Sequence, residues 1–228
     1  MLRTHHYPLL PAGVLAALVP LTLAGMPASA VALTTVFSVT SSLSVHAPLV
    51  VAVDTVDHTV YAVDSAGSTV TVFRGGAFVR ALSIGADATA VAVDSTTHTA
   101  YVTNAGSSDV TVVRADVVVA TVGVGTAPTS VAVDDTTGTA YVGNRLGNSV
   151  SIIRESAPGT FGATTVAVGN RPVAVAVDTS THTAYVVNTL STNVSEIVGN
   201  AVVRTVSVNA DPDAIAVDST THTAYVVN

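Results

Sequence analysis

An aspartate, a histidine and a tyrosine stand close together in the stretch VAVDSTTHTAYVTN, residues 91–104. A carboxylate and an imidazole at such a spacing are groups that bind zinc or move protons in catalytic sites. Nearly the same stretch occurs again along the chain, so these residues are either copies of a site or parts of a repeated structural unit. Which of the two holds depends on the elements that carry them.

The stretch recurs with a nearly constant period. Its tyrosine falls at Tyr61, Tyr101, Tyr141, Tyr185 and Tyr225, so successive copies are 40, 40, 44 and 40 residues apart. The aspartate keeps the same gaps, at Asp54, Asp94, Asp134, Asp178 and Asp218. Four copies are full length, and a fifth stops partway, at Asn228. A period of about 40 residues is typical of repeat proteins in which each copy is one supersecondary unit.

Each full repeat contains four short β-like runs. In the third copy they read SVAVD, TAYVGN, SVSIIR and TTVAV, rich in Val, Ile and Thr and separated by turn residues. Four strands in about 40 residues is the pattern of a propeller blade. We therefore predict an all-β fold, a β-propeller of four-stranded antiparallel blades with four full repeats and a partial fifth. The four extra residues of the third copy fall in RESAPGTFGATT, which we expect to be a surface hairpin.

The repeats resemble those of the YVTN family of β-propellers. The string YVTN is present at residues 101–104, variants of it follow in the other copies, and the lead-in VG..P..VAVD is recognisable in several. The resemblance covers about residues 36–228 and implies the propeller fold. It also implies export, because members of the family are typically exported or cell-surface proteins. Some belong to surface layers, and one periplasmic member contacts DNA.

The N-terminus has the pattern of a secretory leader. Residues 1–30 contain Arg3, an apolar run and a small-residue site, Ala28-Ser29-Ala30, which together predict a signal peptide, with a retained membrane anchor as the alternative. Residues 31–48 form a lead-in, whose residues 36–45 align with the fourth strand of a blade and would close the ring. The propeller repeats occupy residues 49–228. We therefore predict a secreted or cell-envelope protein.

The last repeat supplies only two strands, AIAVD and TAYVVN. Four blades and a part would make a strained, incomplete ring or an open arc. Two explanations stay open: the sequence is a fragment of a longer propeller, or the chain closes through a partner molecule. An open arc exposes strand edges, which invite self-association.

We predict structural roles for the repeated residues, with no metal or other cofactor. The tyrosine ring should pack between blades. The histidine stands late in the turn, and Gly138 replaces it in the third copy. Because glycine and histidine both tolerate a positive φ, we predict a positive φ at this position. Histidines fanned around an axis cannot meet at one ion, and we expect each to have only its own turn's aspartate nearby. The four histidines are His58, His98, His182 and His222.

A ligand site is expected where the repeats differ. The loops between second and third strands and the links between blades lie on one face, where propellers often bind ligands. The residues that these segments place there are Asp87, Arg145, Arg171, Asp211 and Asp213. Arg145 and Arg171 are each the only arginine at their repeat position and come from adjacent repeats. We predict that they bind an anion or a carboxylate together, with a solvated rim of charge as the alternative.

These features favour a binding or scaffold module, for a protein or a cell-envelope polymer, over an enzyme. No catalytic constellation is visible, and Glu155 and Glu196 are the only glutamates. The alternative is a lactonase-like or other hydrolase with a metal in the propeller channel. His46, in the lead-in, is the one histidine of residues 31–228 that has no place in a repeated turn.

Single-stranded nucleic-acid binding is a second alternative. The charge argues against nucleic-acid binding. Residues 31–228 carry seven arginines, no lysine and 15 acidic residues, which gives a formal net charge of −8.

Overall fold

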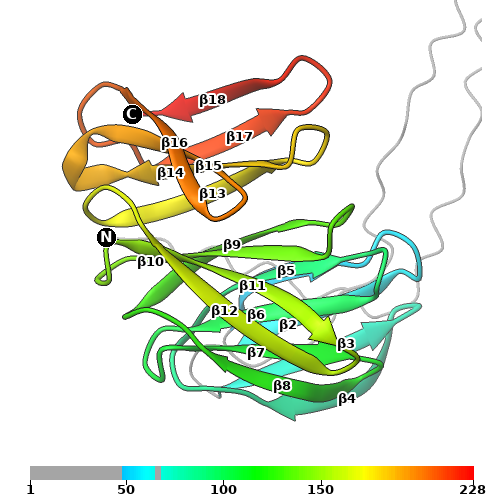
Figure 1. The fold of residues 1–228 in the computed structure, drawn as a ribbon. Helices are drawn as coiled ribbons and strands as arrows, with labels where there is room; N and C mark the ends of the chain where they lie inside the picture. Colours follow the sequence, from blue (N-terminus) through cyan, green and yellow to red (C-terminus); the bar gives the residue numbers. More distant parts are fainter. Residues whose placement is uncertain (1–47, 65–67) are drawn as a thin grey trace, which may run out of the picture. The chain divides into compact units, whose positions relative to one another are not determined.

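The computed structural model describes residues 48–64 and 68–228 (Figure 1). Every described residue belongs to one compact unit, Ser41–Asn228. Apart from one 3₁₀ turn, η1 (Thr189–Ser191), its regular structure consists of strands. These are β1 (Pro48–Val53), β2 (Thr59–Asp64), β3 (Thr69–Arg74), β4 (Ala77–Ser83), β5 (Ala88–Asp94), β6 (Thr99–Asn104), β7 (Asp109–Arg114), β8 (Val117–Gly123), β9 (Pro128–Asp134), β10 (Thr139–Asn144), β11 (Ser149–Ala157), β12 (Thr160–Ala167), β13 (Pro172–Asp178), β14 (Thr183–Asn188), β15 (Asn193–Val198), β16 (Ala201–Ser207), β17 (Ala214–Asp218) and β18 (Thr223–Val227).

The strands form antiparallel sheets in chain order, which confirms the predicted blades. Four sheets have four strands, β1–β4, β5–β8, β9–β12 and β13–β16, and a fifth contains only β17 and β18. The register repeats from blade to blade. Tyr101 of β6 lies opposite Ala92 of β5 and Val112 of β7, and the other full copies keep the same pairing positions.

The hydrophobic core lies between neighbouring blades. The first strands β1, β5, β9, β13 and β17 pack side by side in that order, so they are the inner strands. One cluster joins Tyr61 of the first blade to Val102 and Val113 of the second, and two further clusters join the next blades in the same way. Tyr61, Tyr101 and Tyr141 are at most 2% exposed. The prediction that the tyrosine packs between blades is confirmed for these three copies.

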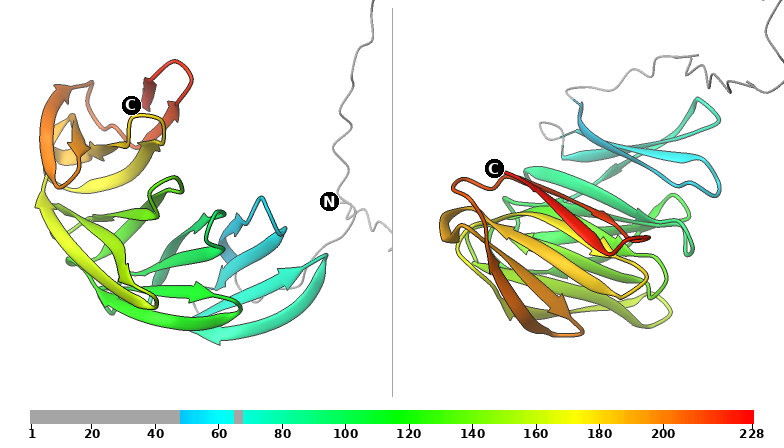
Figure 2. Two further views of the ribbon diagram at one scale, coloured as in Figure 1. Left: turned by 45° about the vertical axis from the view of Figure 1, so that its right-hand side comes forward. Right: turned by 90° about the horizontal axis from the view of Figure 1, so that it is seen from above.

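Burial falls off at the partial fifth blade. Tyr225 of β18 is 62% exposed, whereas Tyr141 is 2% exposed, because no further described sheet covers β18. Within this unit the blades follow one another in chain order around a common centre (Figure 2). β1 and β17, the first and last described inner strands, do not pack extensively against each other.

The four-residue insertion is a surface hairpin, as predicted, and it also lengthens two strands. β11 continues to Ala157 and β12 begins at Thr160. This extension carries Glu155 towards the preceding blade, where Arg114 Nη1 and Nη2 donate hydrogen bonds to its two carboxylate oxygens at 2.9 and 2.7 Å. The insertion therefore also ties the third blade to the second.

Some predicted features lie outside the described residues. They are the leader at residues 1–30, the ring-closing strand at residues 36–45, and His46. In the part of the chain that the structure describes, no helix has the length and apolar character needed to cross a membrane.

Candidate functional site

Each blade has a hairpin turn that is organised by the aspartate at the end of its first strand. Oδ1 of Asp94 accepts hydrogen bonds from the backbone N–H groups of Thr96 and Thr97, at 2.9 and 3.0 Å. Such bonds hold an Asx-type turn in shape. The same two bonds occur at Asp54, Asp178 and Asp218, whereas Oδ1 of Asp134 accepts only the first of them, from the N–H of Thr136.

The residue four positions after this aspartate has a left-handed backbone. Its φ is 60° at His58, 53° at His98, 63° at Gly138, 56° at His182 and 54° at His222. The expectation of a positive φ at this position is confirmed, and it explains why glycine replaces histidine in one copy.

The histidine side chains, however, reach across to the preceding blade. Nδ1 of His98 lies 2.7 Å from Oδ2 of Asp54, and the turns that carry them belong to adjacent sheets. The expectation that each histidine has only its own turn's aspartate nearby is therefore wrong, because neighbouring turns stand close enough for an imidazole to span the boundary. The same contact joins His182 to Asp134 at 2.8 Å and His222 to Asp178 at 2.9 Å.

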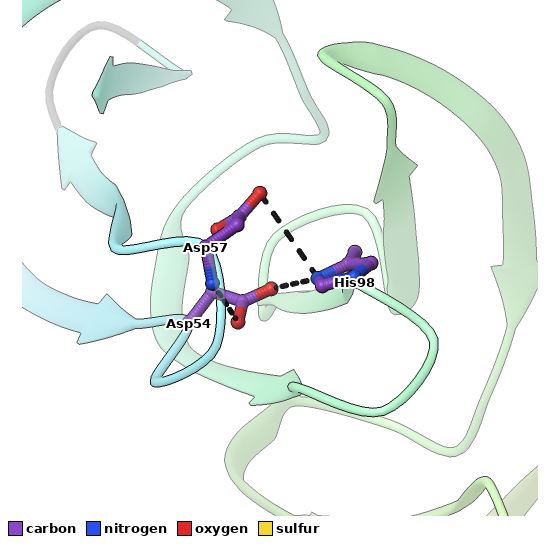
Figure 3. Close-up of side chains that lie close together, drawn as sticks. All are labelled: Asp54, Asp57 and His98. Atoms are coloured by element: carbon purple, nitrogen blue, oxygen red, sulfur yellow. Dashed lines mark hydrogen bonds and ion pairs between the residues drawn. The ribbon is translucent and has the colours of Figure 1, made fainter. Parts of the chain in front are cut away.

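Asp57 adds a third ligand-type side chain at the first of these junctions (Figure 3). Ligand atoms of Asp54, Asp57 and His98 all lie within 4.8 Å of one another, the one such group among the described residues. Each side chain already has a partner: His98 bonds to Asp54, and Asp57 Oδ1 accepts the Thr59 N–H at 2.9 Å. Asp57 Oδ2 also lies 3.8 Å from the Arg74 guanidinium. A divalent ion could bind these three residues only if it displaced the proton between His98 and Asp54. It would also be repelled by the positive charge of Arg74 nearby.

The junction shifts the protonation of its members. The hydrogen bond to Asp54 raises the pKa of His98 above its ordinary value of 6.5. Burial would raise the pKa of Asp54, but hydrogen bonds from His98 and from the backbone N–H of Val56 outweigh it and lower the pKa below 3.8. Both shifts favour the charged forms, so the junction is an imidazolium–carboxylate pair over a wider pH range than free side chains would give.

The opposite ends of the strands hold the predicted ligand site. Arg145 from the β10–β11 loop, Arg171 from the β12–β13 link and Asp213 from the β16–β17 link line one cavity of about 320 Å³. We call this cavity the rim pocket. The structure thus brings three of the five predicted residues together. The rest of its wall consists of Thr129, Val173 and Thr189, which sequence reasoning missed.

Within the described residues, the two rim arginines lack the partners that the other arginines have. Neither the Arg145 nor the Arg171 guanidinium takes part in a described hydrogen bond or ion pair, although both residues are partly buried. With Asp213, the rim pocket carries two positive charges and one negative charge. Hydrogen bonds hold the guanidinium groups of Arg74, Arg80, Arg114, Arg154 and Arg204.

Asp87 and Asp211 do not line the rim pocket. They share one link position with Arg171, and all three residues have a positive φ, of 52°, 56° and 58°. The backbone oxygen of Asp87 accepts a hydrogen bond from the N–H of Ala105 at 2.8 Å. Both aspartates are exposed.

The roles that sequence reasoning missed depend on a neighbouring blade. One signal was present in the repeat: Asp57 stands where the other copies have threonine, so it was visible as an exception before its contact with His98 was known. No comparable signal identifies the wall of the rim pocket. Thr129 and Thr189 are ordinary polar residues, and only the packing of three blades brings them together.

Comparison with solved structures supports the fold. No protein-family profile and no curated protein matches the sequence. Similar structures include virginiamycin B lyase from Staphylococcus aureus, with 10% identity, a TM-score of 0.67, and coverage of 79% of this chain and 63% of that one. A protein from Lactobacillus plantarum has 18% identity, a TM-score of 0.67, and coverage of 79% and 64%. Kuenenia stuttgartiensis hydrazine synthase has 20% identity, a TM-score of 0.62, and coverage of 78% and 54%.

The chain is a β-propeller repeat protein. It spans between 54% and 64% of the length of these three structures. At such identities the likeness concerns the fold alone, and the functions of these proteins differ from one another. The resemblance to the YVTN family rests on the sequence motifs.

Proposed function

We propose that this protein is an exported binding module that holds a carboxylate-bearing partner, a protein or a cell-envelope polymer, at the rim pocket. One observation carries the proposal: Arg145 and Arg171 line the same cavity, and neither guanidinium has a partner in the described part of the chain. A guanidinium offers a planar fork of donors that matches a carboxylate, and partial burial strengthens such charge-assisted bonds. The module has no catalytic step of its own.

The charge of the rim pocket supports a singly charged anion. Two arginines and Asp213 leave a net charge of +1, which one carboxylate neutralises. A doubly charged phosphate would leave excess negative charge beside Asp213. Selection against the wrong ligand by a nearby like charge is a common source of specificity. The location outside the cytoplasm rests on the leader pattern of residues 1–30.

The test is the binding of polyglutamate, a simple carboxylate polymer, to the full chain, measured by calorimetry with neutral dextran as the negative control. A double variant, Arg145→Ala with Arg171→Ala, should weaken polyglutamate binding at least about tenfold, because two charge-assisted contacts are lost. Its matched control is Arg80→Ala with Arg204→Ala, which removes the same two charges outside the rim pocket and should bind as the unchanged protein does. Equal weakening in both double variants, or no polyglutamate binding at all, would overturn the proposal.

A further inference from the structure

One blade junction differs from its neighbours in lacking the histidine. Elsewhere, Nδ1 of a histidine lies 2.7 to 2.9 Å from Oδ2 of the aspartate in the preceding blade. Between the second and third blades, Gly138 occupies the histidine position and contributes no side chain. The aspartate that faces it is Asp94, which closes β5.

Asp94 is consequently left with a buried oxygen that has no partner. The residue is 0% exposed. Its Oδ1 accepts the N–H groups of Thr96 and Thr97, but its Oδ2 has no hydrogen-bond partner among the described residues. A Cβ built on Gly138 would lie 3.7 Å from that oxygen, so position 138 faces it directly. Burial of a carboxylate oxygen without a hydrogen-bond donor costs free energy. A ligand that donates a hydrogen bond to it removes this cost, which favours binding.

A cavity of about 340 Å³ opens at this gap, lined by Asp94 and Gly138 among others. Its size lies at the lower end of the range for ligand pockets, which suits a small molecule. The cavity also offers a second acceptor. At two other junctions, a hydroxyl from the turn of the aspartate lies close to the histidine. Thr136 Oγ1 lies 3.3 Å from His182 Nδ1, and Ser180 Oγ lies 3.1 Å from His222 Nδ1. The equivalent hydroxyl here is that of Thr96, which lines the cavity.

The charge around the gap favours a cation. Arg114 and Glu155 form a two-bond ion pair and neutralise each other. Arg154 donates to the side-chain oxygen of Asn200 at 2.7 Å. The titratable groups that line the cavity are Asp94, Asp135, Glu155, Arg114, Arg154 and Tyr101. Burial raises the pKa of Tyr101 to about 12, so its phenol stays neutral and the lining carries two positive charges against three negative ones.

We propose that the gap between Asp94 and Gly138 is a binding site for a small organic cation with an N–H donor, an imidazolium or amine compound whose nitrogen takes the place of the missing histidine. The nitrogen donates to Oδ2 of Asp94, and the rest of the molecule occupies the cavity above Gly138. The site lies at the opposite ends of the strands from the rim pocket and is independent of it.

The test is a titration of the full chain with imidazole, followed by the backbone amide NMR signals of Thr97 and Gly138. Sodium chloride at equal ionic strength and sodium acetate serve as controls. Imidazole should cause saturable shifts at these two amides, with a Kd in the millimolar range. Gly138→His fills the gap with the side chain used at the other junctions, at a φ that histidine already adopts there. This variant should lose the imidazole response and unfold at a higher temperature.

A second variant, His182→Gly, opens an equivalent gap at Asp134 and should gain a second imidazole site, seen as new shifts in that turn. Absence of saturable shifts at Thr97 and Gly138, or an unchanged response in Gly138→His, would overturn the proposal. A response to acetate in place of imidazole would overturn it as well, because it would mean that the cavity binds anions.

Discussion

Nδ1 of His182 lies 2.8 Å from Oδ2 of Asp134, across the boundary between the fourth blade and the third. His182 therefore combines two roles, a left-handed turn residue in its own blade and a hydrogen-bond donor to the blade before. Asp134 likewise shapes its own turn through Oδ1 and accepts from the next blade through Oδ2. The fourth repeat thus contributes to two successive junctions, through His182 to the third blade and through Asp178 to the fifth, and these junctions link the blades outside their apolar core.

Removal of a junction histidine should destabilise the propeller. His182→Gly keeps the positive φ but leaves Oδ2 of buried Asp134 without its donor, which we expect to cost about 1–2 kcal/mol of unfolding free energy, since water can reach the opened site. The matched control is His58→Gly, because His58 has the same backbone conformation and its side chain has no described partner. Its effect should stay within about 0.5 kcal/mol. Urea unfolding of both variants checks this, and equal losses would show that the cross-blade bond contributes nothing.

The contribution of the first junction should depend on pH. The raised pKa of His98 means that its contribution is complete below pH 6.5 and declines as the pH rises through the native value. The lowered pKa of Asp54 means that its contribution is complete above pH 3.8 and declines as the pH falls through the native value. Stabilisation is therefore greatest between these limits.

The check is the difference in unfolding free energy between the unchanged protein and His98→Gly, at about pH 5 and at about pH 8.5. The difference should shrink at the higher pH. It should not vanish, since a neutral imidazole with its proton on Nδ1 can still donate to Asp54. A difference that grows at the higher pH would contradict the assignment.

Gly123, which ends β8, and Gly125, in the link that follows, differ in how closely they are packed. A Cβ on Gly125 would lie 2.6 Å from Nδ2 of Asn144, whose amide bonds to Ser149 and Ser151 in β11. Gly125→Ala should therefore cost about 1–3 kcal/mol of stability through overpacking. Gly123→Ala is the control, because nothing lies within 4 Å of a Cβ there, and it should change stability by less than about 0.5 kcal/mol. Thermal and urea unfolding distinguish the two, and equal effects would refute the close packing.

Asp213 should weaken the proposed carboxylate binding. Asp213→Asn changes the net charge of the rim pocket from +1 to +2, so polyglutamate affinity should rise about twofold to fivefold. Asp211→Asn makes the same change in protein charge two residues away, at a side chain that does not line the pocket, and should leave the affinity unchanged. Calorimetry on both variants is the measurement. Equal increases would mean that only the overall charge matters.

Part of the rim pocket could be predicted from the sequence. Arg145 and Arg171 stand out as exceptions in adjacent repeats, and strand alternation puts their loops on one face, so their meeting in one cavity follows from the repeat. The same reasoning could not separate Asp213 from Asp87. Both lie in links, and which of them faces the arginines depends on how neighbouring blades turn about the common centre.

The sequence by itself determined the blades: the 40-residue period, the alternation of Val with Thr and Ala, and the turn residues are local properties, and each copy folds through pairing with its nearest neighbours in the chain. It also determined the positive φ at His98 and Gly138, because glycine and histidine share that preference. Only the tertiary structure decided what those side chains do. His98 and Asp54 are 44 residues apart and meet because adjacent blades pack at a fixed distance and angle, which no local preference encodes. The empty position opposite Asp94 is likewise a property of two blades together.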